Sequence, residues 1–436
     1  MKKAVITILG LQGGRIENDK ATFTNIDNIA NYYFEDENES TKKEYFNTLP
    51  LLIEKYSDEY EIIPIYTKDS KTVNQAVLAE LYSKLNVDFN ETYFIEDEKN
   101  FKEVFSLFNK TLEKFDEVII DVTHGFRHLP LLMLVELLIH NFRDTKKIQK
   151  ILFAKEKLKH TRNDKGLYEI IDLKEYLELA NISFILTTFE KNYTVANHIE
   201  SEKYKKLIDA LNDFSNDLMA LNLNNLFENS IDELKDELNM IDDVSISTQA
   251  KNLYQHIDKV FKQSEKRYLT YYNLSRELFD KKYMLISLSL LNESLRLYIK
   301  TAIKKENKEI VERIEAFYEE DLYKIGDFFV KLYSFNKKED KYINKMYKDI
   351  KSIKNITKEK RLQDILSESD FLKLINSFPS KLKEQIKIND EEKILTDHIG
   401  HKRNNLAHAN SSTVSFDTIH DDIKSLIEEF ENRCKI

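Results

Sequence analysis

The stretch KAVITILGLQGG, residues 3–14, indicates the fold of the first part of the chain. Residues 4–9 form an uninterrupted apolar run, as expected of a strand that is buried on both faces of a parallel sheet. Three glycines, Gly10, Gly13 and Gly14, come directly after this run. The pattern predicts a buried first strand that ends in a glycine-rich turn.

Similar apolar runs recur until about residue 180. Further strands are expected at residues 61–67, 92–95, 117–122, 151–154 and 166–173. Helical patterns lie between them, at residues 41–57, 70–86, 99–114 and 129–144. Strands that alternate with helices predict a Rossmann-like α/β domain, with a parallel sheet that carries helices on its faces.

The rest of the chain is predicted to be all-α. The whole sequence has seven glycines and four prolines among 436 residues, whereas ordinary usage is about 7% glycine and about 5% proline. An all-β fold, which needs frequent turn residues, is therefore excluded. Beyond residue 180, apolar residues recur at helical spacing, as in Leu285, Leu288, Leu291, Leu295 and Ile299.

These textures predict three parts: an α/β domain over residues 1–180, a helical connector over 181–260 and a helical domain over 261–436. The polar stretch 242–249 is the best candidate for an internal linker. The longest apolar run, residues 129–139, is too short to span a bilayer. A soluble, cytoplasmic protein without membrane contact is expected.

Charge and cysteine content narrow the function further. The formal net charge is −10, so a protein that coats DNA through a general positive field is excluded. The only cysteine is Cys434, which excludes a disulfide framework and a thiolate metal site.

Four of the seven glycines follow two predicted strands: Gly10, Gly13 and Gly14 follow the first, and Gly125 follows residues 117–122. Ligands of open parallel sheets bind beyond the carboxyl ends of the strands, where glycine lets the backbone approach closely. The plain alternative is that each glycine only makes a turn. The spacing matches neither a dinucleotide fingerprint nor a phosphate-binding loop of the Walker type, which disfavours a nicotinamide dehydrogenase.

Gly125, the glycine after the second of these strands, lies in DVTHGFRHLP, residues 121–130. Hydroxyl, imidazole and guanidinium groups from Thr123, His124, Arg127 and His128 gather there before a helical run. Such groups near a helix N-terminus suit a phosphate or nucleobase ligand. The plain alternative is that Thr123 or His124 only caps the helix. A zinc protease is disfavoured because HGFRH lacks the glutamate of that motif.

A second constellation lies in TDHIGHKRNNLAHAN, residues 396–410. Read as a helix, it has an apolar seam and a separate polar stripe. The seam is Leu395, Ile399 and Leu406, and the stripe is Asp397, His401, Asn404 and His408. Arg403 lies about 140° around the helix from His408, so the two side chains converge only if Arg403 bends round or a second helix takes part. The alternatives are a plain structural helix and a metal site from His398, His401 and His408, which lacks an accompanying carboxylate or thiolate.

Taken together, the two constellations resemble the CARF–HEPN ribonucleases of type III CRISPR systems. The resemblance covers nearly the whole chain and rests on AVITILGLQGG (residues 4–14), VIIDVTHGFRHLP (118–130) and RNNLAH (403–408). It implies a CARF-like sensor domain for cyclic oligoadenylate and a HEPN-like nuclease domain. The activator, a cyclic tetra- or hexa-adenylate, is then expected at both loops. The residues that this assigns to activator binding are Gly10, Leu11, Gln12, Gly13, Gly14, Thr123, His124, Gly125, Phe126, Arg127 and His128.

The same resemblance implies an allosteric endoribonuclease of antiviral CRISPR defence. Arg403 and His408 would be catalytic, with Asn404 as their polar neighbour, in a composite site of a homodimer. Single-stranded RNA would be cut by its own 2′-OH without metal or other cofactor, and the sensor domain is a candidate for slow cleavage of its activator. Glu293 either orients Arg403 or lies at the edge of the core.

Two other functions are compatible with the sequence. One is a nucleotide-sensing module that binds a partner or regulates DNA without nuclease activity, which the basic stretch 337–357 favours. The other is a small-molecule enzyme whose site lies wholly within residues 1–180. In the ribonuclease hypothesis, residues 181–260 would transmit the signal from the sensor to the nuclease.

Overall fold

The computed structural model divides the chain into two compact units. The sheet unit comprises Met1–Asn212 with Met240–Ala250, and the helical unit comprises Asp213–Asn239 with Lys251–Ile436. The structure describes residues 1–434 except 12–13, 19, 24–28, 97–98, 126–127, 142, 162–163, 196–198, 320, 336–346, 349–360, 377–394 and 409–413.

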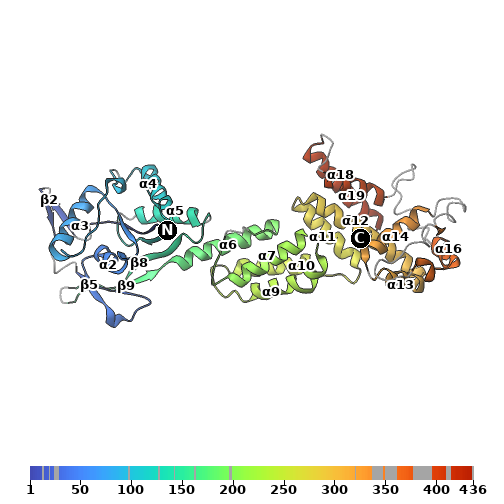
Figure 1. Ribbon diagram of the computed structural model, residues 1–436, viewed down its shortest axis with the longest axis horizontal. Helices are drawn as coiled ribbons and strands as arrows, with labels where there is room; N and C mark the ends of the chain where they lie inside the picture. The colour runs from blue at the N-terminus through green and yellow to red at the C-terminus, as the bar shows by residue number, and fades with distance from the viewer. Residues whose placement is uncertain are drawn as a thin grey trace. The chain divides into compact units, whose positions relative to one another are not determined.

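The sheet unit, drawn in blue to green in Figure 1, is built on a seven-stranded sheet. The order of its strands is β5-β4-β9-β8-β7-β1-β6. The strands are β1 (Lys3–Ile8), β4 (Ala30–Phe34), β5 (Lys43–Tyr45), β6 (Glu61–Ile65), β7 (Glu117–Asp121), β8 (Ile148–Leu158) and β9 (Leu167–Asp172). β1 runs parallel to both β6 and β7, and β7 is parallel to β8. β8 with β9 and β4 with β5 are antiparallel, so the predicted parallel sheet is a mixed one. A separate hairpin joins β2 (Arg15–Glu17) and β3 (Lys20–Thr22).

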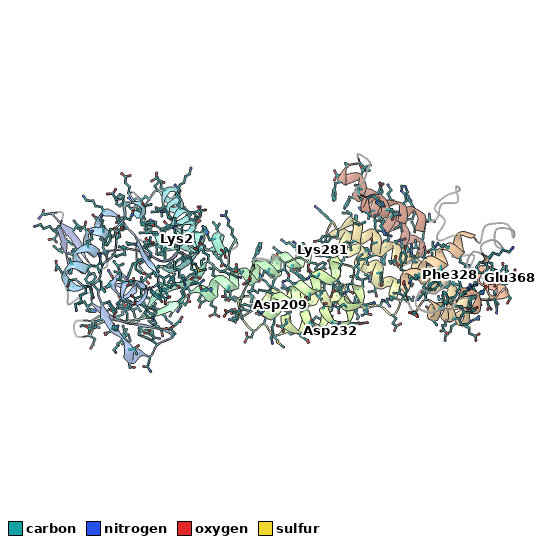
Figure 2. The ribbon with its side chains drawn as sticks, in the orientation of Figure 1. Lys2, Asp209, Asp232, Lys281, Phe328 and Glu368 are labelled. Atoms are coloured by element: carbon teal, nitrogen blue, oxygen red, sulfur yellow. The ribbon has the colours of Figure 1, made fainter. Side chains whose placement is uncertain are left out.

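Helices connect the strands of this unit. Those between strands are α2 (Thr48–Tyr56), α3 (Lys68–Leu81), α4 (Phe101–Glu113) and α5 (His128–Asn141). The helix α6 (Lys174–Asn192) follows β9, and the boundary between the two units falls within α7 (Lys205–Met219). The middle of β1, Ala4 to Ile6, is fully buried between the neighbouring strands and the helices. Lys2 donates its backbone N–H to the Asp116 carboxylate over 2.7 Å, which joins the amino ends of β1 and β7 (Figure 2). The central strands therefore form the rigid part of the unit.

Two local predictions for this unit are wrong. The helix expected over residues 41–57 begins only at Thr48, because Lys43–Tyr45 pairs with β4 and a 3-10 turn, η1 (Glu39–Thr41), precedes it. The strand expected over 92–95 is a 3-10 turn, η2 (Glu91–Tyr93), with one bridge between Phe94 and Tyr66. In both places pairing with another segment of the chain, β4 in the first and Tyr66 in the second, accompanies a local conformation that a short sequence window does not predict.

The helical unit is organised around α12. Its helices are α8 (Leu223–Asn225), a π-helical turn η3 (Leu226–Ser230), α9 (Ile231–Asn239), α10 (Ser247–Val260), α11 (Arg267–Asp280), α12 (Met284–Glu306), α13 (Lys308–Phe317), α14 (Leu322–Phe335), η4 (Leu362–Asp364), α16 (Glu368–Asn376), α18 (Leu395–Ala407) and α19 (Phe416–Cys434). α12 contacts α11, α13, α14, α18 and α19 (Figure 1). Phe328 of α14 is among the buried residues of this core (Figure 2).

The apolar series predicted from helical spacing lies on α12. Leu288, Leu291, Leu295 and Ile299 are fully buried, whereas Leu285 near the start of the helix is exposed. The predicted fold class, an α/β domain followed by an all-α part, is confirmed. Of the candidate linker 242–249, residues 247–249 begin α10. In the described residues, every helix is too short or too polar to cross a membrane.

The first testable prediction concerns the central strand β7. Ile120 is fully buried, so Ile120→Ala should reduce the free energy of unfolding by about 2–5 kcal/mol, because it removes apolar contacts and leaves a cavity. Ile139→Ala, at a half-exposed position on α5, should change it by about 0.5 kcal/mol or less. Urea unfolding followed by circular dichroism compares the two; equal effects would contradict the assigned core.

Candidate functional site

The two glycine-containing loops lie beside each other. β1 and β7 are neighbouring parallel strands with Thr7 paired to Asp121, so the loops that follow them leave the same edge of the sheet. β6 pairs with the other side of β1. The chain therefore leaves β1 at a point where the strand order changes direction, which is where ligands bind in open α/β sheets.

The first loop is tied to α3. The side-chain amide of Asn74 donates to the Gly10 carbonyl over 3.1 Å, and the Gly14 N–H donates to the Leu11 carbonyl over 2.8 Å. A Cβ on Gly14 would lie 2.5 Å from Val73 Cγ1, so only glycine lets the loop pack this closely on α3. Gln12 and Gly13 lie outside the described residues.

The second loop requires glycine for its backbone conformation. Gly125 has a φ of +103°, and a Cβ there would lie 2.7 Å from Ile8 Cγ2 at the end of β1. His128 begins α5, and its ring centre lies 5.2 Å from that of Phe101. Phe126 and Arg127 lie outside the described residues.

The Asp121 carboxylate connects three elements at this edge. Its Oδ2 accepts hydrogen bonds from the hydroxyls of Thr7 and Thr48, over 2.8 and 2.7 Å, and its Oδ1 accepts the Thr123 N–H over 3.0 Å. Asp121 is 1% exposed. Buried carboxylates require such donors, so the end of β1, the start of α2 and the second loop are held in one arrangement.

His124 is fixed by the first turn of α2. Its Nε2 accepts the Thr48 backbone N–H over 3.3 Å, which leaves the proton of the neutral ring on Nδ1. Burial lowers the pKa of His124, and the nearby Asp121 opposes this in part. Thr123 accepts the Ala154 N–H over 2.9 Å. Both side chains are thus engaged with elements other than α5, which they were considered to cap.

Three residues of this site were missed by the sequence analysis: Asn47, Thr48 and Asn74. Asn47 caps α2 and donates through its side-chain amide to Asn74 Oδ1 over 2.8 Å. Asn74 in turn holds Gly10, whereas Thr48 holds His124. The only signal in the sequence is the helix-start pattern of NTLP, residues 47–50, an asparagine N-cap with a proline in the first turn.

In the helical unit, RNNLAH lies at the end of α18. Leu395 and Ile399 are fully buried and Leu406 is partly buried against the core, so the predicted apolar seam is present. The His408 N–H donates to the Asn404 carbonyl over 3.0 Å, and both side chains are exposed. His398 and His401 are also exposed, and the side chain of Asp397 lies outside the described part.

Arg403 faces a hollow of about 730 Å³. The hollow is lined by residues 221–224, Glu228, Arg267, Tyr271, Ser289, Leu290, Glu293, Leu297, Glu319, residues 321–323 and Arg403. His408 is not one of the described residues that line this hollow. One chain therefore brings Arg403 together with Glu293 and Arg267, but it does not bring His408 into the same hollow.

Glu293 responds electrostatically to Arg403. Burial raises the pKa of Glu293. The positive charges of Arg296 and Arg403 lower this pKa and so offset part of the effect of burial. Glu293 lines the hollow together with Arg403 and its side chain is 26% exposed, so both roles left open for it, orienting Arg403 and lying at the edge of the core, stay predictions.

Two further features of the sequence were candidates for a site, the histidines of residues 398–408 as metal ligands and the basic stretch 337–357. Across the part of the chain that is described, no three His, Cys, Asp or Glu side chains are gathered so that they could hold a metal ion. Of the basic stretch 337–357, only Tyr347 and Lys348 are among the described residues.

Comparisons with known proteins give structural matches only. No family model and no curated protein matches the sequence. Among solved structures the chain is similar to Enterococcus italicus Csm6 bound to cyclic hexa-2′-fluoro-hexa-dAMP, with 14% sequence identity and a TM-score of 0.33. That match covers 100% of this chain and 93% of the Csm6 chain.

The second prediction concerns the pH dependence of stability. The folded state lowers the pKa of His124, whereas unfolded histidine titrates near 6.5. The unfolded state therefore binds protons more readily below about pH 6.5, and stability should fall as the pH drops through this range. His124→Asn should lose less stability than the wild type between about pH 7 and 5.

Urea midpoints across this pH range provide the measurement. His140, whose pKa is also lowered by burial, contributes in the same direction, so a His124→Asn, His140→Asn double variant should have the flattest profile. A His124→Asn profile that follows the wild type throughout would show that His124 is not kept neutral by the fold.

Proposed function

We propose that this chain is a cyclic-oligoadenylate-activated endoribonuclease that cuts single-stranded RNA, without metal, in antiviral CRISPR defence. The observation that carries the proposal is the placement of the two sensor motifs. The loops beginning at Gly10 and at Thr123 are 113 positions apart in sequence, yet they follow neighbouring parallel strands. The resemblance assigns the activator to these two loops, and the fold puts them at one edge.

The chemistry of this edge suits a cyclic nucleotide. The second loop contains Gly125 and leads into the start of α5 at His128, and the N-terminus of a helix favours phosphate. The neutral His124 ring carries its proton on Nδ1 and can donate to a base or sugar oxygen or nitrogen. Thr48 and Asn74 hold these groups in place before the ligand arrives, which reduces the entropy lost on binding.

In the helical unit, the proposed reaction uses the RNA's own 2′-OH. The 2′-oxygen forms a bond to phosphorus and the bond from phosphorus to the 5′-oxygen breaks, which leaves a cyclic phosphate. His408 would move a proton between the 2′-OH and the leaving 5′-oxygen, a role that suits imidazole. Arg403 would stabilise the charge that develops on the phosphoryl oxygens.

A homodimer is part of this proposal. The hollow beside Arg403 lacks His408 of the same chain among its described lining residues, and the His408 side chain is exposed. A second copy of α18 would bring the missing imidazole. Since a ligand shifts only an equilibrium between states that it binds differently, the activator would have to favour the dimer in which these groups meet.

The third prediction tests the nuclease. The full chain should cut single-stranded RNA in EDTA only when cyclic tetra- or hexa-adenylate is added, and His408→Ala should reduce the rate by about 100-fold or more, because the proton-transfer group is lost. His401→Ala, an exposed histidine on the same helix, is the matched control. A requirement for added metal, or full activity of His408→Ala, would contradict the mechanism.

The fourth prediction tests the sensor. His124→Ala should weaken binding of the cyclic oligoadenylate in calorimetry, because it removes the ring that the first turn of α2 holds at the loop. His160→Ala should bind like the wild type, since His160 accepts the Gly166 N–H elsewhere in the sheet unit. Unchanged affinity in a folded His124→Ala variant would contradict the position of the activator site.

A further inference from the structure

Gly326 is a glycine in the middle of α14, where glycine costs about 1 kcal/mol relative to alanine. A Cβ at this position would lie 2.8 Å from Arg296 Cβ and 3.3 Å from Arg296 Cδ. Because glycine has no Cβ, α14 can approach α12 closely at the point where Arg296 begins. The contact keeps the stem of Arg296 in one place.

The guanidinium of Arg296 is buried and incompletely paired. The side chain is 12% exposed, and among the described residues its Nε and Nη1 have no hydrogen-bond partner. The nearest carboxylate oxygens are Glu293 Oε1, 4.0 Å from Nε, and Asp327 Oδ1, 3.9 Å from Nη1. The ring of Tyr323 lies 4.7 Å from the guanidinium carbon.

Buried N–H groups without acceptors are costly for folding, yet Arg296 adjoins the hollow that Arg403 lines. Tyr323 and Glu293, which both contact Arg296, are lining residues of that hollow. Charges alternate across three helices: Arg403 on α18, Glu293 and Arg296 on α12, and Asp327 on α14, which also pairs with Lys331 over 2.7 Å.

We propose that Arg296 is a positioning residue of the RNA-cleaving site, which acts on Arg403 through Glu293 and is itself seated by Gly326. Glu293 Oε1 lies 4.0 Å from Arg296 Nε, and Glu293 lines the same hollow as Arg403, so its negative charge acts on both guanidinium groups. Arg296 thereby keeps Glu293 from pairing fully with Arg403, and Arg403 retains N–H donors for a phosphate. The inference rests on the proposed nuclease function and extends it to a residue that lies behind the lining of the hollow.

Removing Arg296 should change the ionisation of Glu293. The groups that influence Glu293 or share its hollow are Arg296, Arg403, Asp327, Asp321, Arg267, Glu228 and Glu319. Since most of the remainder are acidic, loss of Arg296 leaves the negative charge of Glu293 less compensated, and its pKa should rise further. Protonation of Glu293 would then release Arg403, so part of the activity lost with Arg296 should return as the pH falls.

The fifth prediction compares Arg296→Met with Arg296→Lys in the full chain with activator. Arg296→Met should lower kcat by about tenfold with little change in KM, because the RNA does not touch Arg296. The rate of Arg296→Met relative to that of the wild type should rise as the pH falls, because a protonated Glu293 no longer pairs with Arg403. Arg296→Lys, which keeps the charge, should retain more activity, and Gly326→Ala, which crowds Arg296 Cβ, should shift the profile in the direction of Arg296→Met.

A double-mutant cycle on stability tests the same contact without any activity. Glu293→Gln should raise the urea midpoint of Arg296→Met more than that of the wild type at neutral pH, because the uncompensated carboxylate destabilises the variant. If Arg296→Met does not fold, the cycle is measured instead with Glu293→Gln combined with Arg296→Lys or with Gly326→Ala.

The outcomes separate this inference from the proposed function. If the wild type fails to cut RNA, the nuclease proposal is contradicted, while the cycle still reports whether Arg296 controls Glu293. If the wild type cuts RNA and Arg296→Met keeps its kcat and pH profile, the positioning role of Arg296 is overturned. Equal effects of Glu293→Gln in both backgrounds would overturn it as well.

Discussion

The arrangement of the sheet unit depends on the hydrogen bonds to one buried carboxylate, that of Asp121. It sits at the end of β7 and accepts from Thr7 on β1, from Thr48 at the start of α2 and from the backbone of Thr123. If one of these donors were lost, the desolvation of the buried carboxylate would no longer be compensated and the folded state would be destabilised. The strand ends, α2 and the second loop are therefore fixed as a group, and His124 takes its orientation from Thr48 within that group.

Much of the architecture could be predicted from the sequence. Continuous apolar runs at β1, β6 and β7 and helical spacing along α12 depend on burial, which leaves a local pattern. The adjacency of β1 and β7 is a finding of the structure, because an α/β pattern does not fix the order of the strands. The strand β9 was expected at residues 166–173, but its antiparallel pairing with β8 was not, and the strands β4 and β5 were missed because they are short and are defined by pairing with other segments.

Some residues of the candidate sites could be identified from the sequence and others could not. Gly125 was identifiable because a positive φ demands glycine, which is rare in this chain. Asn74 and Arg296 were not, because neither is special in its own segment. Asn74 matters through a carbonyl 64 positions away, and Arg296 matters because α14 brings Gly326 against it. Their roles arise only when distant elements pack together.

The two candidate sites differ in whether one chain supplies all of their residues. At the sheet edge, one chain supplies both loops and the residues that hold them, so a ligand meets groups that are already in place. In the helical unit, Arg403 faces the hollow with Glu293, while His408 is exposed beyond the last turn of α18. If both side chains act on one phosphate, the second imidazole must come from another copy. Under the proposed function, a ligand at the sheet edge would then control cleavage by changing how two copies pair, without altering Arg403 or His408 of either one.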